Sequence, residues 1–131
     1  MPNIFDIRFS SAVLFFLFAG TACTFAHNVT AVIKTPSLIY RIDAASGAYK
    51  GSIQVSNAIS VGCDGKTIAV LLGSGLVNRY DAQNGAYRGS IQAGKDAESV
   101  QVSGGVITVR TKSQLKRYEA DSGSYIGMTQ L

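Results

Sequence analysis

Three arginines and three tyrosines recur at a constant interval of 38 residues, and both residue types could bind ligands. The arginines are Arg41, Arg79 and Arg117, and the tyrosines are Tyr49, Tyr87 and Tyr125. Guanidinium groups repeated around one end of a channel would attract anions or acidic glycans. Exposed phenol rings could stack on sugars. These six residues are therefore the candidate ligand-binding residues of the sequence.

The same residues also have a structural interpretation. Arg79 and Asp81 lie two residues apart in an expected strand, so their side chains project to the same face. An ion pair between them, within one repeat or between two repeats, would orient the turn that follows. The tyrosines would then cover a sheet edge or pack between repeats. Neither residue type supplies a general base or a nucleophile by itself.

Catalytic and metal-binding chemistry finds no support in the sequence. His27 is the only histidine and precedes the repeats, and no cluster of His, Cys, Asp and Glu has metal-ligand spacing. The run "GCDGKT" at 62–67 ends like a phosphate-binding loop, but Ser60 stands where that loop needs its first glycine. The following run "IAVLL" is β-type, whereas the loop needs a helix N-terminus. We expect no enzymatic activity, no cofactor and no metal.

The positions between the repeated residues predict short β-strands. One period contains four segments rich in Val, Ile, Leu and Tyr, at 58–63, 66–72, 75–82 and 86–92. Asp64-Gly65 is a two-residue hairpin signal. Asp81 can accept hydrogen bonds from the backbone two residues on, and Gly85 supplies a positive φ, so these two residues form the third turn.

Similar strand segments occur in the periods before and after this one. The following period contains segments at 97–102, 106–111, 114–120 and 124–130, whereas the preceding unit supplies only three, at 29–34, 37–44 and 48–54. A first strand for that unit is missing or lies in the N-terminal leader. A period near 40 residues built from β-segments is typical of propeller blades or a similar array.

The chain resembles bacterial β-propeller repeat proteins of the quinoprotein-like or NHL-like type, over about residues 28–131. The resemblance rests on a strand that ends in Tyr-Asp-Ala and leads through a glycine turn into an aromatic outer strand, as in "YDAQNGAYRGSIQ" at 80–92. Quinoprotein-type blades commonly carry Trp shortly after the turn glycine, where this chain has tyrosine. The resemblance implies an all-β fold of about three antiparallel four-stranded blades, at about 28–54, 58–92 and 97–131.

The N-terminal segment predicts export. The apolar run "AVLFFLFAG" at 12–20 is too short to span a bilayer and has the form of a signal-peptide core. Cleavage before His27 would leave a leader at 1–26 and a repeat domain at 27–131, in a secreted or periplasmic protein. The alternative is a lipid anchor at Cys23. Cleavage at His27 would leave Cys63 as the only cysteine, so we expect a buried apolar thiol and no internal disulfide.

Composition narrows the class of partner. With 47% hydrophobic and 15% charged residues the chain should fold, and the formal charge of +4 is scattered rather than gathered in a stripe, so nucleic acid is not an expected partner.

Propellers usually close with about four to eight blades. A three-blade array would stay open, or close by oligomerisation, for example head to tail, or it would be part of a larger propeller.

Three functions remain open from the sequence. The leading prediction is an exported binding or scaffold module without catalysis, whose partner is another protein or a second copy docked at the open blade edges. The first alternative is an oligomeric, lectin-like propeller that binds a glycan. The second alternative is a fragment of a quinoprotein-type enzyme. A membrane would be a partner only if Cys23 were lipidated.

Overall fold

The computed structural model describes residues 22–23 and 29–131, which form only strands, turns and irregular connections. Twelve strands build three antiparallel sheets of four strands each, in sequential order. Sheet 1 contains β1 (Ala22–Cys23), β2 (Val29–Thr35), β3 (Leu38–Asp43) and β4 (Tyr49–Gln54). Sheet 2 contains β5 (Ala58–Cys63), β6 (Thr67–Leu72), β7 (Leu76–Asp81) and β8 (Tyr87–Gln92). Sheet 3 contains β9 (Ser99–Ser103), β10 (Val106–Arg110), β11 (Gln114–Glu119) and β12 (Tyr125–Gln130).

The eleven strands predicted from the sequence are all present, with ends that differ by at most two residues. The first strand of the first unit is β1, which lies within the predicted leader and pairs with β2 through Ala22 and Val32. Cleavage before His27 would therefore remove β1 from sheet 1. The apolar run at 12–20 lies outside the described residues, and cleavage and lipidation stay predictions.

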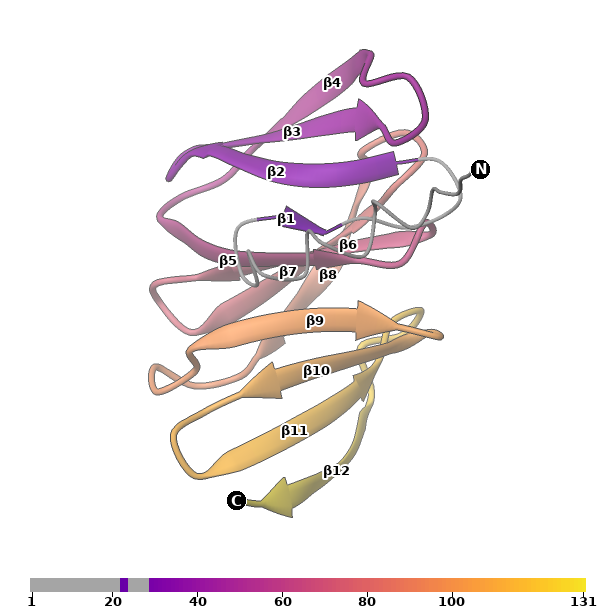
Figure 1. The fold of residues 1–131 in the computed structure, drawn as a ribbon. Coiled ribbons are helices and arrows are strands. Elements are labelled where there is room, and N and C mark those ends of the chain that lie inside the picture. Colours follow the sequence, from indigo (N-terminus) through magenta and orange to yellow (C-terminus); the bar gives the residue numbers. More distant parts are fainter. Residues whose placement is uncertain (1–21, 24–28) are drawn as a thin grey trace, which may run out of the picture.

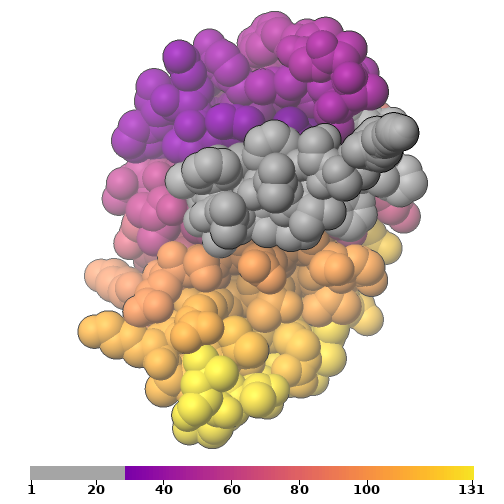
Figure 2. Space-filling view, in the orientation of Figure 1, coloured from indigo at the N-terminus to yellow at the C-terminus, as the bar shows by residue number. Residues whose placement is uncertain are grey.

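The three sheets fan out from their first strands (Figure 1). β5 contacts both β1 and β9, so the first strands of the three sheets are neighbours. The outer strands β4 and β12 lie at opposite ends of the molecule in this view. In the space-filling view the sheets follow one another as bands from indigo to yellow (Figure 2). Each sheet therefore contacts the next one in the chain through its face.

The hydrophobic core consists of two layers, one between each pair of adjacent sheets. The first layer joins sheets 1 and 2, and its largest fully buried members are Val29, Ile39, Val61, Ile68 and Val70. The second layer joins sheets 2 and 3, and its largest are Leu71, Val77, Val100, Ile107 and Val109. Sheet 2 is thus covered on both faces, and every residue of β6 is buried. This explains why "TIAVLL" is an uninterrupted apolar run rather than an alternating one.

Short hairpins connect the strands with the turn chemistry that the sequence predicts. Between β5 and β6, the Asp64 carboxylate accepts hydrogen bonds from the amides of Lys66 and Thr67, and Gly65 has a φ of 91°. Gly104 and Gly105 occupy the same place in sheet 3 with φ values of 58° and 82°. Positive φ at consecutive turn residues matches the twist of a two-residue hairpin.

Cys63 differs from the sequence prediction. Its side chain is buried, with an exposed fraction of 3%, but it is disulfide-bonded rather than a free thiol. The prediction failed because it rested on cleavage before His27, which would remove the only other cysteine of the sequence. Within the described residues, no helical segment has the length and apolar character needed to traverse a bilayer.

Candidate functional site

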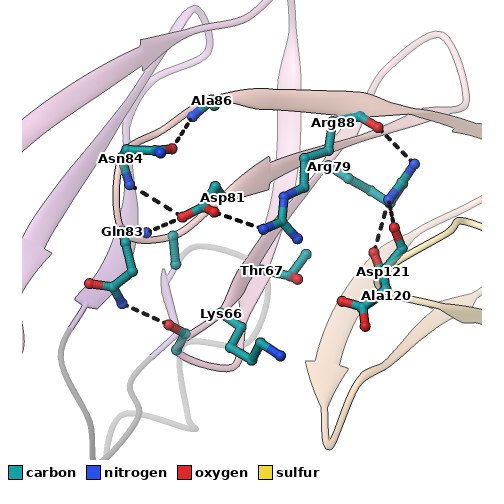
Figure 3. A network of polar contacts seen from close by, with 12 residues as sticks. Lys66, Thr67, Arg79, Asp81, Gln83, Asn84, Ala86, Arg88, Ala120 and Asp121 are labelled. Carbon is teal, nitrogen blue, oxygen red and sulfur yellow. Dashed lines mark hydrogen bonds and ion pairs between the residues drawn. The ribbon is translucent and has the colours of Figure 1, made fainter.

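Arg79 links sheet 2 to sheet 3. It projects from β7 and is buried, with an exposed fraction of 6%. Its Nη1 atom donates to the carbonyl oxygens of Ala120 and Asp121 in the β11–β12 turn, both at 2.9 Å, and Nη2 donates to the carbonyl of Arg88 in its own sheet at 2.8 Å. Figure 3 shows the guanidinium between these carbonyl groups. One side chain therefore connects two strands of sheet 2 with the turn of the following sheet.

Arg41 makes the same contacts one repeat earlier. Its Nη1 atom donates to the carbonyls of Ala82 and Gln83 at 3.3 and 3.1 Å, and its Nη2 atom donates to the carbonyl of Lys50 at 3.2 Å. The planar fork of donors on a guanidinium suits several carbonyl oxygens at once, which a single ammonium group cannot match. The 38-residue spacing of the arginines thus reflects a contact that each sheet makes with the next.

Two of the repeated glycines make room for Arg41. A Cβ atom added to Gly51 would lie 2.5 Å from Nη2 of Arg41, and one added to Gly85 would lie 3.0 Å from its Nε. Gly51 belongs to the outer strand of the same sheet, and Gly85 belongs to the turn of the next sheet. The guanidinium is therefore enclosed between two glycines, with φ values of 142° and 78° that also favour glycine.

Asp81 holds the carbonyl acceptors of Arg41 in place, and Asp43 holds the equivalent turn of sheet 1. Oδ1 of Asp81 accepts hydrogen bonds from the amides of Gln83 and Asn84 at 2.7 and 3.3 Å, and Oδ2 pairs with Arg88 at 2.7 Å. Asp43 makes the same turn with the amides of Ala45 and Ser46. The expected Arg79–Asp81 ion pair is wrong, because Arg79 bonds carbonyl groups of the neighbouring sheet while Asp81 faces its own turn and Arg88.

Both aspartates titrate below their ordinary range. For Asp43, the amides of Ser46 and Ala45 stabilise the carboxylate and lower its pKa. For Asp81, burial raises the pKa, but the backbone amide of Gln83, the side chain of Arg88 and the amide of Asn84 together outweigh it, so the pKa is lowered. The charged form of each carboxylate is therefore the one that stabilises the turn.

The three candidate tyrosines lie at equivalent places on the outer strands. Their exposed fractions are nearly equal, at 61% for Tyr49, 60% for Tyr87 and 59% for Tyr125. Each ring packs on a tyrosine of the preceding strand, with centroid distances of 5.1 to 5.7 Å. Burial raises the pKa of two of these supporting tyrosines, Tyr80 and Tyr118. Each sheet therefore presents one supported but accessible phenol ring.

Arg117 differs from the other two arginines. It is half-buried in sheet 3, and its Nη1 atom donates to Oγ1 of Thr129 in its own sheet at 2.9 Å. The six candidate residues thus divide into two buried arginines bonded to main-chain carbonyls, one arginine bonded within its sheet, and three exposed tyrosines. Their binding of a ligand stays a prediction.

The sequence did not reveal the acceptors of the arginines, because they are backbone carbonyls. The spacing still held a signal, since each acceptor pair lies 41 and 42 residues after its arginine and directly after an acidic residue, Asp81 or Glu119. Within the part of the chain that the structure describes, no group of three or more His, Cys, Asp or Glu side chains could hold a metal ion.

Comparison with known proteins identifies the fold. No protein-family model matches the sequence, and a search of curated proteins gave no match. Among solved structures, the chain is similar to BamB from Moraxella catarrhalis, with a TM-score of 0.71 and 13% identity over 86% of this chain and 37% of that one. It is also similar to apo AztD from Citrobacter koseri, with a TM-score of 0.67 and 17% identity over 86% and 33% of the two chains.

A third similar structure is that of the RRP9 WD40 repeats, with a TM-score of 0.70 and 15% identity over 86% of this chain and 39% of that one. The chain thus spans between a third and two fifths of the length of these proteins. Together with the three open four-stranded sheets, these similarities confirm the predicted fold. The chain has the fold of a partial β-propeller, and its three sheets are blades.

Replacing Arg79 should weaken the contact between sheets 2 and 3. R79K keeps the charge but cannot reach three carbonyls, so we expect the free energy of unfolding to fall by about 1–3 kcal/mol. R117K is the matched control, because that arginine bonds only within sheet 3, and its effect should stay within about 0.5 kcal/mol. Urea unfolding followed by circular dichroism measures both. Equal losses in the two variants would contradict the interblade role of Arg79.

Adding a methyl group at Gly51 should displace Arg41. Gly47 offers a matched control, because its φ is 77° but no atom lies within 4 Å of an added Cβ. Both variants, G51A and G47A, carry the backbone strain of a positive φ, whereas only G51A adds steric overlap, which costs about 1–3 kcal/mol more. Thermal unfolding of the two proteins side by side tests this difference. A G47A protein as unstable as G51A would refute the packing argument.

Acid should weaken the third turns of sheets 1 and 2. Because the pKa values of Asp43 and Asp81 are lowered on folding, their contribution is present above the unfolded-state pKa, about 3.9, and is lost as the pH falls through the folded-state values. We expect the free energy of unfolding to decrease below about pH 4. The D43N/D81N double variant should show a shallower decrease. Identical pH profiles for the two proteins would show that these carboxylates do not contribute.

Proposed function

We propose that the protein is an exported, non-catalytic β-propeller-type module that binds a protein partner through the exposed tyrosines of its blades. The observation that carries the proposal is the nearly equal exposure of Tyr49, Tyr87 and Tyr125, each close to 60% exposed and each in contact with a second tyrosine ring of its own sheet. Tyrosine is enriched in protein interfaces, where it contributes large contact areas at a small entropic cost.

The use of the other repeated residues supports a non-catalytic role. The guanidinium groups of Arg41 and Arg79 are occupied by main-chain carbonyls, and the carboxylates of Asp43 and Asp81 are occupied by turn amides. These polar side chains hold the blades together and are not available to act on a substrate. Of the six candidate residues, only the three tyrosines are mostly exposed. Export is supported by the apolar run at 12–20 of the sequence.

The inner rings would help such binding by limiting the motion of the outer ones. Tyr87 packs on Tyr80 with a centroid distance of 5.7 Å, and Tyr80 is 5% exposed and accepts a hydrogen bond from Asn78 at 3.0 Å. A ring that is already positioned loses less conformational freedom when a partner covers it. The same rings could stack on sugars, so a glycan remains the second candidate ligand.

Site-specific photo-crosslinking tests the proposal in the organism that encodes the chain. A benzophenone analogue of phenylalanine would replace Tyr49, Tyr87 or Tyr125 in turn, with the exposed turn residue Lys112 as the control position. We expect the three tyrosine positions to give adducts with the same protein, and the control position to give none. Y87S should then weaken adduct formation from positions 49 and 125.

The outcomes separate the alternatives. The absence of adducts at all three positions, or equal adducts at Lys112, would refute the binding role of the tyrosines. A glycan array with wild type and Y87S tests the second candidate in parallel. Binding there that Y87S abolishes, without any protein adduct, would replace a protein partner by a glycan. Thermal unfolding of Y87S provides the control that its fold is intact.

A further inference from the structure

The outward face of sheet 3 corresponds to the faces through which sheets 1 and 2 contact the next sheet. Strand pairing places Gln101, Thr108, Arg117 and Gly127 in one row across sheet 3. The equivalent row of sheet 2 contains Gly62, Ala69, Arg79 and Gly89. The arginine and the glycine beside it are thus retained, but the two innermost positions carry larger polar side chains in sheet 3.

A second row of residues, next to the first, also becomes more polar in sheet 3. In sheet 1 it contains Ile33, Ile39 and Ile53, and in sheet 2 it contains Leu71, Val77 and Ile91. These six side chains lie in the two core layers. The equivalent residues of sheet 3 are Arg110, Leu115 and Thr129. Arg110 and Thr129 are exposed, so two of the three apolar positions have become polar where the face meets solvent.

The change at the innermost position, from Gly62 in sheet 2 to Gln101 in sheet 3, also opposes the close packing of a further strand. A Cβ atom added to Gly62 would lie 2.8 Å from the Cα atom of Gln101 and 3.0 Å from the amide nitrogen of Val102. β9 therefore approaches β5 so closely only because Gly62 has no side chain. Gln101 stands in the place of Gly62 on sheet 3, and its exposed side chain occupies the space that the first strand of a further sheet would need.

The guanidinium of Arg117 also has a different hydrogen-bond acceptor. In sheets 1 and 2 the Nη1 atom of the arginine donates to the next sheet, whereas that of Arg117 donates to Oγ1 of Thr129. Thr129 stands in the place of Ile53 and Ile91. The same substitution that removes an apolar contact thus supplies a hydrogen-bond acceptor for the arginine within its own sheet.

We propose that the outward face of sheet 3 is a solvent-facing cap that prevents a further blade, including one from a second copy of this chain, from packing there as sheets 2 and 3 pack on their predecessors. The cap consists of Gln101, Thr108, Arg110 and Thr129. A repeat array needs a polar outer face at its end to stay soluble. A head-to-tail ring built by this contact is therefore disfavoured by the residues of the face itself.

Replacing the cap residues should allow a second copy of the chain to bind to the outward face of sheet 3. The variant Q101G/T108A/R110L/T129I restores the residue types of sheet 2 and releases Arg117, which could then reach the carbonyls of Ala44 and Ala45 in another copy. These carbonyls correspond to those of Ala82 and Gln83. We expect the variant to associate at a concentration at least about tenfold lower than wild type, measured by sedimentation velocity. Equal association of both proteins would overturn the proposal.

A second measurement uses a nearly wild-type chain and does not depend on how the fourfold variant folds. R110C places a thiol on the cap, and its rate of maleimide labelling reports whether the face is covered. We expect the same rate in dilute and in concentrated protein, as for K112C, a control in the neighbouring turn. Labelling of R110C that slows at high protein concentration while K112C does not would show that another copy covers the face, and would refute the cap.

Discussion

The fold depends on an arginine that reaches from one blade to the turn of the next. Arg79 donates hydrogen bonds to two carbonyl groups of sheet 3 and to one of sheet 2, and it is almost completely buried. A buried charge needs several compensating partners, and three carbonyl oxygens supply them for Nη1 and Nη2, whereas Nε is buried without a hydrogen-bond partner among the described residues. The contact also fixes the position of sheet 3 relative to sheet 2, because Ala120, which supplies one acceptor, belongs to the apolar layer between the two sheets. Arg41 fixes sheets 1 and 2 in the same way.

Several of the residues that recur every 38 positions are explained by this contact. The turn must hold two consecutive carbonyl groups toward the preceding blade, and the Asp81 carboxylate holds it through the amides of Gln83 and Asn84. Gly85 leaves room for the incoming guanidinium, and Gly89 leaves room for the arginine of its own blade. An arginine and two glycines are therefore requirements of one interaction, which explains why they recur together at a fixed interval, whereas the acidic residue before the acceptors is Asp81 in sheet 2 and Glu119 in sheet 3.

The architecture could be predicted from the sequence because it rests on local signals. Alternating apolar segments, hairpin pairs such as Asp64-Gly65 and a constant period determine the strands and their order. The partners of Arg79 could not be predicted, because its acceptors are main-chain atoms that have no residue signature. The sequence left open whether the first strand of the first unit is missing or lies in the leader, and β1 lies in the leader. The bonded state of Cys63 was missed because cleavage before His27 would remove the other cysteine of the sequence.

The differences between the repeats carry information that the repeated residues do not. A residue needed by every interface recurs, so a position that departs from the pattern indicates a sheet in a different environment. Thr129 departs where Ile53 and Ile91 are buried, and it is exposed and bonded to Arg117. The tyrosines show the opposite behaviour, since Tyr49, Tyr87 and Tyr125 recur although they remain mostly exposed. Burial does not explain their recurrence, but a ring contact within the same sheet recurs with each of them.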